Sequence, residues 1–169
     1  RSERQQMLEK NIRLRAIGDL QRLPAPVRAA LEEIMEATRN NTGLTVCLAL
    51  SYGAREEIVQ AARVMALAVR NGQLDPQAIT ERTFARALWT TDIPDPDFLI
   101  RTSGEFRLSN FLLWQSAYAE LYVTETLWPD FTRSEFLAAL EVYQSRERRF
   151  GRTTEQRGLT SDLARVTRS

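Results

Sequence analysis

The sequence of 169 residues contains no histidine and only one cysteine. No apolar run approaches the roughly 20 residues that a membrane-spanning helix requires. Without histidine the chain cannot form a Ser-His or Cys-His dyad, and it lacks the commonest zinc ligand. The single Cys47 excludes a disulfide within the chain, which suits a reducing cytoplasm, and its apolar surroundings predict a small buried core residue. Any chemistry must therefore use carboxylates, arginine or a bound metal ion such as Mg²⁺.

Lysine is nearly absent as well, because only Lys10 among the 23 basic residues is a lysine. The net charge is nevertheless only +1 and no nucleic-acid-binding motif is present, so we expect no nucleic-acid partner. With 43% hydrophobic and 27% charged residues, the composition is that of a globular protein. The length suits one domain, which we place at residues 1–152. Residues 153–169 lack aromatic side chains, and we expect them to form a disordered tail.

Strand and helix patterns alternate along the chain. The apolar run 44–50 is short and continuous, as is typical of a strand that is buried on both faces of a parallel sheet. The other predicted strands are 12–17, 98–101 and 121–124, and the predicted helices begin near Pro24, Ser51, Asp75, Asn110 and Thr132. The last of these helices should start with a capping box of Thr132 and Glu135. This order favours an α/β fold with a mostly parallel central sheet flanked by helices, in which ligands bind beyond the carboxyl ends of the strands.

Two arginines follow the predicted strand 98–101 closely. Arg101 ends that strand, and Arg107 and Ser109 precede the predicted aromatic helix that begins at Asn110. Guanidinium groups bind phosphate oxygens through two parallel hydrogen bonds, and a helix N-terminus adds N–H donors. The segment is therefore a candidate diphosphate cradle. The alternatives are that Arg101 forms an ion pair with Glu105 or Asp97, and that Ser109 is a plain helix cap.

Glu120 lies among apolar and aromatic residues, where an unpartnered carboxylate would be costly. Two partners are possible. One is an arginine in a salt bridge, and the other is a Mg²⁺ ion that bridges to a diphosphate.

Four segments carry a family resemblance. Residues 97–115 read Asp-Phe-Leu-Ile-Arg-Thr-Ser-Gly-Glu-Phe-Arg-Leu-Ser-Asn-Phe-Leu-Leu-Trp-Gln, 118–122 read Tyr-Ala-Glu-Leu-Tyr, 127–131 read Leu-Trp-Pro-Asp-Phe, and 146–151 read Arg-Glu-Arg-Arg-Phe-Gly. In these segments the chain resembles the cis-prenyltransferase family, and within it the bacterial undecaprenyl diphosphate synthases. The resemblance extends more weakly over most of residues 1–152.

The resemblance implies an α/β enzyme that condenses isopentenyl diphosphate onto an allylic diphosphate with Mg²⁺ and forms a cis double bond. It implies a cytoplasmic homodimer that can lie at the surface of the membrane into which its product partitions. The residues that it implies for the isopentenyl diphosphate are Arg101, Arg107, Leu108 and Ser109, with Glu120 for Mg²⁺ and with Arg149 and Gly151 in an element that reaches toward the partner subunit.

The family's Asp-Gly-Asn-Gly-Arg-Trp-Ala segment, which carries its catalytic aspartate, has no counterpart in these residues. We therefore expect the chain to be the C-terminal two-thirds of one cis-prenyltransferase domain, with its catalytic residue unknown and with no activity as 169 residues alone. Two other readings remain open. One is a non-catalytic partner subunit of a heteromeric prenyltransferase, and the other is an arginine-rich nucleic-acid binder.

Overall fold

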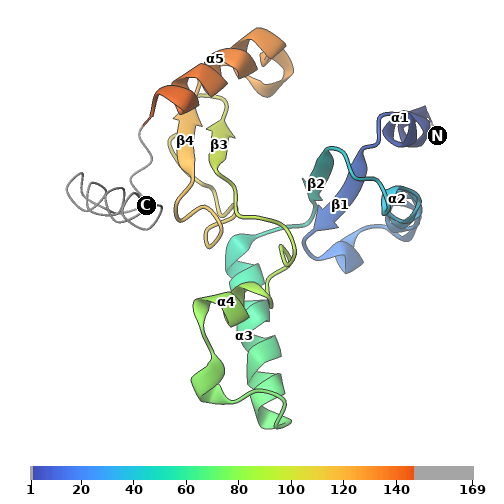
Figure 1. Cartoon of the computed structure of the whole chain (residues 1–169), viewed down its shortest axis with the longest axis vertical. Helices are drawn as coiled ribbons and strands as arrows, with labels where there is room; N and C mark the ends of the chain where they lie inside the picture. Colours follow the sequence, from blue (N-terminus) through green and yellow to red (C-terminus); the bar gives the residue numbers. More distant parts are fainter. Residues whose placement is uncertain (1, 147–169) are drawn as a thin grey trace, which may run out of the picture. The chain divides into compact units, whose positions relative to one another are not determined.

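The computed structural model describes residues 2–146, which fall into two compact units (Figure 1). Unit 1 comprises the chain up to Pro94 together with Leu108–Trp114. Unit 2 comprises Asp95–Arg107 and the described residues from Gln115 to Arg146. The predicted tail 153–169 lies outside the described residues. The domain boundary at residue 152 stays a prediction.

Unit 1 begins with α1 (Ser2–Glu9) and strand β1 (Arg13–Ile17), which a 3-10 turn at Leu20–Arg22 connects to α2 (Ala25–Thr38). Strand β2 (Thr45–Ala49) then pairs with β1 in parallel, as its sequence pattern predicted. The parallel pair places the carboxyl ends of both strands at the same edge.

Helix α2 packs on β1 through a buried threonine. The Thr38 hydroxyl donates to the Ile34 carbonyl at 2.9 Å and accepts from the Leu14 N–H at 3.1 Å. Leu14 and Leu31 are buried beside it. Val27, at the start of the helix, is exposed.

Helix α3 (Ala54–Arg70) follows β2, and Figure 1 shows the short helix α4 (Glu81–Ala85) beside it. A 3-10 turn at Pro76–Ala78 connects the two helices. The buried face of α3 consists of Ala54, Glu57, Ala61 and Met65.

Unit 2 contains the parallel pair β3 (Phe98–Arg101) and β4 (Glu120–Val123). A 3-10 turn at Trp128–Asp130 leads to α5 (Arg133–Ser145), whose start is the predicted capping box of Thr132 and Glu135. The α/β class and the parallel strands that the sequence predicted are thereby confirmed. The four described strands form two separate pairs.

Two local predictions are wrong. The first is the burial of the run 44–50 on both faces: Leu44, Cys47 and Leu48 are exposed, because in the described residues β2 pairs with β1 alone and its outer face is not covered. The second error is the helix from Asn110, since the segment between β3 and β4 is a series of turns. Ser109, Asn110 and Leu112 have φ values of 49°, 62° and 46°, which a right-handed helix excludes.

None of the helices within residues 2–146 is both long enough and apolar enough to span a membrane.

Candidate functional site: an arginine clamp and an anchored loop

In unit 2, Arg101 and Arg107 both form ion pairs with one carboxylate. Glu105 forms an ion pair with Arg101 through one oxygen and with Arg107 through the other. We call these three residues the arginine clamp. The side chains of Arg101 and Glu105 are each 33% exposed, and that of Arg107 is 65% exposed. The structure thus shows the alternative in which Arg101 pairs with Glu105. Because Arg107 pairs with the same carboxylate, both guanidinium groups meet at a single anion that solvent can reach.

The turn after β3 makes this clamp possible. Ser103 and Gly104 have φ values of 69° and 66°, and they reverse the chain so that Glu105 returns to Arg101. A side chain at Gly104 would also collide with the Glu125 carboxylate. The Ser103 and Gly104 N–H groups donate to the carbonyls of Thr126 and Thr124 at 3.0 and 2.8 Å. Because these N–H groups are engaged within unit 2, the clamp presents guanidinium groups rather than backbone donors.

Glu120 is not part of the clamp. The register pairs Glu120 with Phe98 and Val123 with Arg101, so Glu120 and Arg101 lie at opposite ends of the strand pair. Three residues of strand separate those ends by about 10 Å. The Glu120 carboxylate forms an ion pair with Arg146 at 3.0 Å, and Arg146 also donates to the Leu121 carbonyl at 2.9 Å. Of the two partners that the sequence left open, the structure shows the arginine.

The structure does not supply a ready metal site at the clamp. Within residues 2–146 no three acidic, histidine or cysteine side chains gather as metal ligands. Glu120 offers a single carboxylate that is already paired, whereas Mg²⁺ in such sites takes one or two carboxylates plus phosphate oxygens. The described residues alone do not fit a Mg²⁺ ion shared with the arginine clamp.

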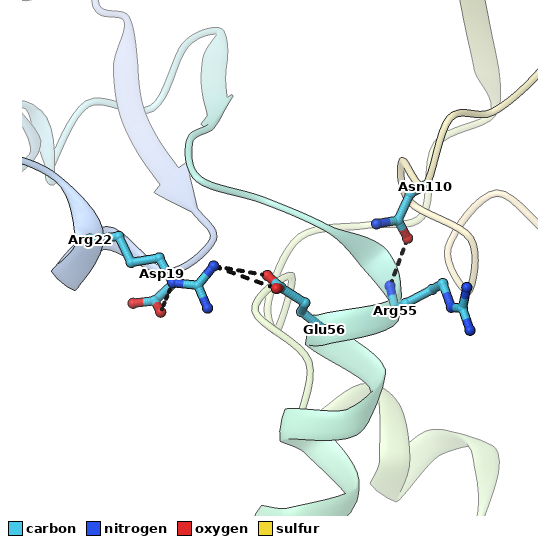
Figure 2. Close-up of polar contacts among 5 residues, drawn as sticks. All are labelled: Asp19, Arg22, Arg55, Glu56 and Asn110. Carbon is cyan, nitrogen blue, oxygen red and sulfur yellow. Dashed lines mark hydrogen bonds and ion pairs between the residues drawn. The ribbon is translucent and has the colours of Figure 1, made fainter.

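Leu108 and Ser109 belong to unit 1. The residue that follows them, Asn110, forms hydrogen bonds to the start of helix α3 (Figure 2). The Asn110 carbonyl accepts from the Ala54 N–H at 2.8 Å, and its side-chain Oδ1 accepts from the Arg55 N–H at 2.9 Å. The sequence analysis missed Asn110 in this role. The usable signal was that asparagine tolerates positive φ, which argues against placing it within a helix.

A polar groove of about 690 Å³ runs along the start of α3 in unit 1. Figure 2 shows the Arg22 guanidinium between two carboxylates, with Asp19 at 3.0 Å and Glu56 at 3.3 Å. Arg55 and Arg63 also line the groove. The sequence analysis did not predict it.

The predicted site residues therefore have different outcomes. Arg101 and Arg107 meet in unit 2, Leu108 and Ser109 lie in the anchored loop of unit 1, and Glu120 lies at the far end of the β3–β4 pair. Arg149 and Gly151 lie outside the described residues. The role of each of these residues stays a prediction.

The two parallel strand pairs and their helices define an α/β protein. The two arginines that share one anion at the end of β3 are of the kind that suits phosphate groups. A family model described as "Putative undecaprenyl diphosphate synthase" matches residues 1–151. The chain belongs to this family of prenyltransferases.

Known relatives agree with the family. The chain is 52% identical over 156 residues to an isoprenyl transferase of Chlorobaculum tepidum, covering 92% of this chain and 59% of the relative. It is 53% identical over 150 residues to an isoprenyl transferase of Porphyromonas gingivalis, covering 89% of this chain and 59% of the relative. The chain thus spans about three fifths of the length of these two relatives.

Two solved structures share the fold. Lavandulyl diphosphate synthase from Lavandula x intermedia, in complex with dimethylallyl diphosphate, has a TM-score of 0.85 and 43% identity over 89% of this chain and 65% of that one. A probable undecaprenyl diphosphate synthase from Campylobacter jejuni has a TM-score of 0.76 and 38% identity over 89% of this chain and 68% of that one. These matches confirm the predicted family, and they do not favour the partner-subunit or nucleic-acid readings.

Proposed function

We propose that this chain carries the isopentenyl diphosphate site of a cis-prenyltransferase, which condenses isopentenyl diphosphate onto an allylic diphosphate. The observation that carries the proposal is the arginine clamp, in which one anionic group bridges Arg101 and Arg107. The family and the similarity to a synthase bound to dimethylallyl diphosphate support both substrate classes.

The clamp is suited to exchange its anion. Glu105 contributes one negative charge through two oxygens, and each oxygen contacts a different guanidinium. A diphosphate group carries more charge and more acceptor oxygens than a carboxylate, so it competes effectively for the same donors. Because Arg107 is 65% exposed, a ligand can approach without unfolding the turn.

The proposed chemistry needs no protein nucleophile, which agrees with a chain that has no histidine. The allylic substrate loses its diphosphate, the double bond of isopentenyl diphosphate attacks the resulting allylic centre, and a proton leaves to give the new cis double bond. Arg101 and Arg107 would hold the isopentenyl diphosphate and neutralise its charge, and Leu108 and Ser109 would complete its binding segment.

Magnesium dependence is proposed from the family, with Glu120 as the candidate ligand. A Mg²⁺ ion would neutralise diphosphate charge, and Glu120 would have to release Arg146 to bind it. Glu120→Gln should weaken the binding of Mg²⁺ to the chain, and its Mg²⁺ dependence is measured by calorimetric titration with MgCl2. An unchanged Mg²⁺ dependence in this variant would remove Glu120 from the proposal.

A homodimer and a cytoplasmic location at the membrane surface complete the proposal, because a long polyprenyl product is apolar and would partition into lipid. Arg149 and Gly151 are the proposed elements that reach the partner's site. Analytical ultracentrifugation that shows only monomer at micromolar concentration would contradict the dimer, and failure of the chain to bind vesicles that carry polyprenyl product would contradict the membrane association.

The proposed site is tested by calorimetric titration of the chain with isopentenyl diphosphate. Arg101→Lys and Arg107→Lys should each weaken binding about tenfold, or roughly 1.4 kcal/mol, because lysine keeps the charge but loses the planar fork. Arg133→Lys, at the exposed start of α5, is the matched control and should bind like the wild type. Equal affinities in all four proteins would remove the arginine clamp from the site.

A further inference from the structure

Helix α3 begins at Ala54, directly after Gly53, which has no side chain that could cap it. Gly53 is the N-cap and has no side chain to accept from the first turn. The N–H groups of Ala54 and Arg55 would therefore lack partners, as the first N–H groups of a helix do. Asn110 supplies both acceptors from a segment more than fifty residues away. Its carbonyl accepts from Ala54, and its Oδ1 accepts from Arg55, as Figure 2 shows for the Oδ1 contact. Asn110 thus performs the task of an N-cap residue from outside the helix.

Gly53 is what lets Asn110 approach. A Cβ atom at Gly53 would lie 2.9 Å from the Asn110 Nδ2 atom, which is closer than such contacts ordinarily are. The absence of a side chain at Gly53 therefore leaves the space that the Asn110 side chain occupies.

A second contact holds the same loop through Tyr52. The rings of Tyr52 and Phe111 meet edge to face at 5.7 Å, and the Leu112 N–H donates to the Tyr52 hydroxyl. That hydroxyl donates to Glu57 at 2.5 Å. Burial, together with the hydrogen bond to Glu57, raises the pKa of Tyr52 above its usual range, so the hydroxyl stays protonated. Glu57 is only 1% exposed and also accepts from the Trp89 N–H at 2.9 Å.

These contacts hold a backbone that would not keep its shape unaided. Ser109 and Asn110 are consecutive residues with positive φ, a conformation that non-glycine residues adopt at an energetic cost. Such strain persists where surrounding contacts fix it, and the contacts of this loop include those of Asn110 with α3 and those of Phe111 and Leu112 with Tyr52.

We infer that Asn110 is a positioning residue, which holds Leu108 and Ser109 in their binding conformation by capping helix α3. The inference rests on the proposed function, because Leu108 and Ser109 bind isopentenyl diphosphate in that proposal. Asn110 acts through the loop backbone and requires no contact of its own with the ligand.

The test compares two Asn→Gly variants at opposite ends of the same helix. Asn110→Gly removes the Oδ1 acceptor, and glycine adopts the local φ of 62° without strain. Asn71→Gly, at the C-cap of α3, is the matched control. Asn110→Asp keeps an acceptor oxygen and tolerates positive φ, so it is the rescue variant. Circular dichroism confirms folding, hydrogen exchange monitors the Ala54 and Arg55 amides, and calorimetry measures isopentenyl diphosphate affinity.

Asn110→Gly should speed exchange of the Arg55 amide and weaken binding about fivefold or more, the equivalent of one lost cap. Asn71→Gly should bind within about twofold of wild type, and Asn110→Asp should restore both Arg55 protection and affinity. In the wild type, ligand should slow exchange at Ala54 and Arg55, because coupling between binding and the cap is reciprocal. If Asn110→Gly does not fold, Tyr52→Phe, which removes only the hydroxyl, should give the same weakening.

Faster Arg55 exchange with unchanged affinity in Asn110→Gly would overturn the inference and leave the proposed function standing. The same holds if Asn110→Asp protects Arg55 but binds as weakly as Asn110→Gly. A wild-type chain that does not bind isopentenyl diphosphate at all would instead contradict the proposed function, and the inference would fall with it.

Discussion

The arginine clamp of unit 2 and the anchored loop of unit 1 are held by opposite kinds of contact. The clamp consists of ion pairs between Glu105 and two arginines, and all three side chains are at least one-third exposed. The loop is held by uncharged hydrogen bonds that Asn110 accepts from the start of α3, and by ring contacts of Tyr52. The Tyr52 hydroxyl in turn donates to Glu57, a carboxylate that is almost completely buried.

The difference indicates a division of roles. Exposed ion pairs contribute little to stability and are weakened by salt, so a competing anion can replace one partner. The hydrogen bonds of Tyr52 and Trp89 to the buried Glu57 carboxylate are costly to break, because a buried donor that loses its acceptor does not regain water. We therefore expect the clamp to exchange its contents and the anchored loop to keep its structure.

The largest expected effect is the loss of the buried carboxylate. Glu57→Ala should lower the free energy of unfolding by about 3 kcal/mol, because the Tyr52 O–H and the Trp89 N–H would be buried without an acceptor. Urea denaturation measures this change. The neighbouring Glu56→Ala is the control, since Glu56 forms an exposed ion pair with Arg22 and should cost at most about 1 kcal/mol. Equal losses in both variants would contradict the distinction between buried and exposed contacts.

A smaller effect is expected from salt, which should weaken ligand binding at the arginine clamp but leave the hydrogen bonds of the anchored loop unchanged. Raising NaCl from about 0.05 M to about 0.5 M should weaken isopentenyl diphosphate binding several-fold, because the clamp acts through partly exposed charges. Hydrogen exchange at the Ala54 and Arg55 amides should change little over the same range, because Asn110 holds them without charge. A salt-independent affinity would show that the ligand is bound elsewhere than on the exposed arginines.

The smallest expected effect concerns the start of α5 in unit 2. A hydrogen bond from the Thr126 hydroxyl, with another from the Thr132 N–H, lowers the pKa of Glu135 below its usual value. A lowered pKa in the folded state adds stability above the usual pKa, and this stability is lost as pH falls through the folded value. The difference in melting temperature between wild type and Glu135→Gln should therefore narrow from about pH 6 to about pH 3. Glu141→Gln, on the same helix, is the control. If the difference in melting temperature between wild type and Glu135→Gln stays constant with pH, the ionised Glu135 carboxylate is not the source of the added stability.

Local signals predicted the regular elements well. The four-residue strand that ends at Arg101 and the capping box of Thr132 and Glu135 were both confirmed, because each depends on neighbouring residues alone. The pairing of Arg101 with Glu105 was also among the alternatives that spacing suggested, since the two are four residues apart.

Contacts between distant segments could not be predicted in the same way. The aromatic run after Ser109 reads as a helix, but Asn110 caps α3 and the backbone turns at positive φ. Cys47 reads as a core residue, but whether its face is covered depends on elements beyond its own strand. Glu120 could have met an arginine or a metal, and only the strand register shows that it lies away from Arg101.

The central claim, that the arginine clamp binds the diphosphate of isopentenyl diphosphate, is tested most directly by a crystal structure of the chain with that ligand. We expect diphosphate oxygens within hydrogen-bonding distance of both Arg101 and Arg107, with Glu105 displaced from at least one guanidinium. The Asn110 contacts with Ala54 and Arg55 should be unchanged. A diphosphate bound elsewhere, with both ion pairs of Glu105 intact, would contradict the account.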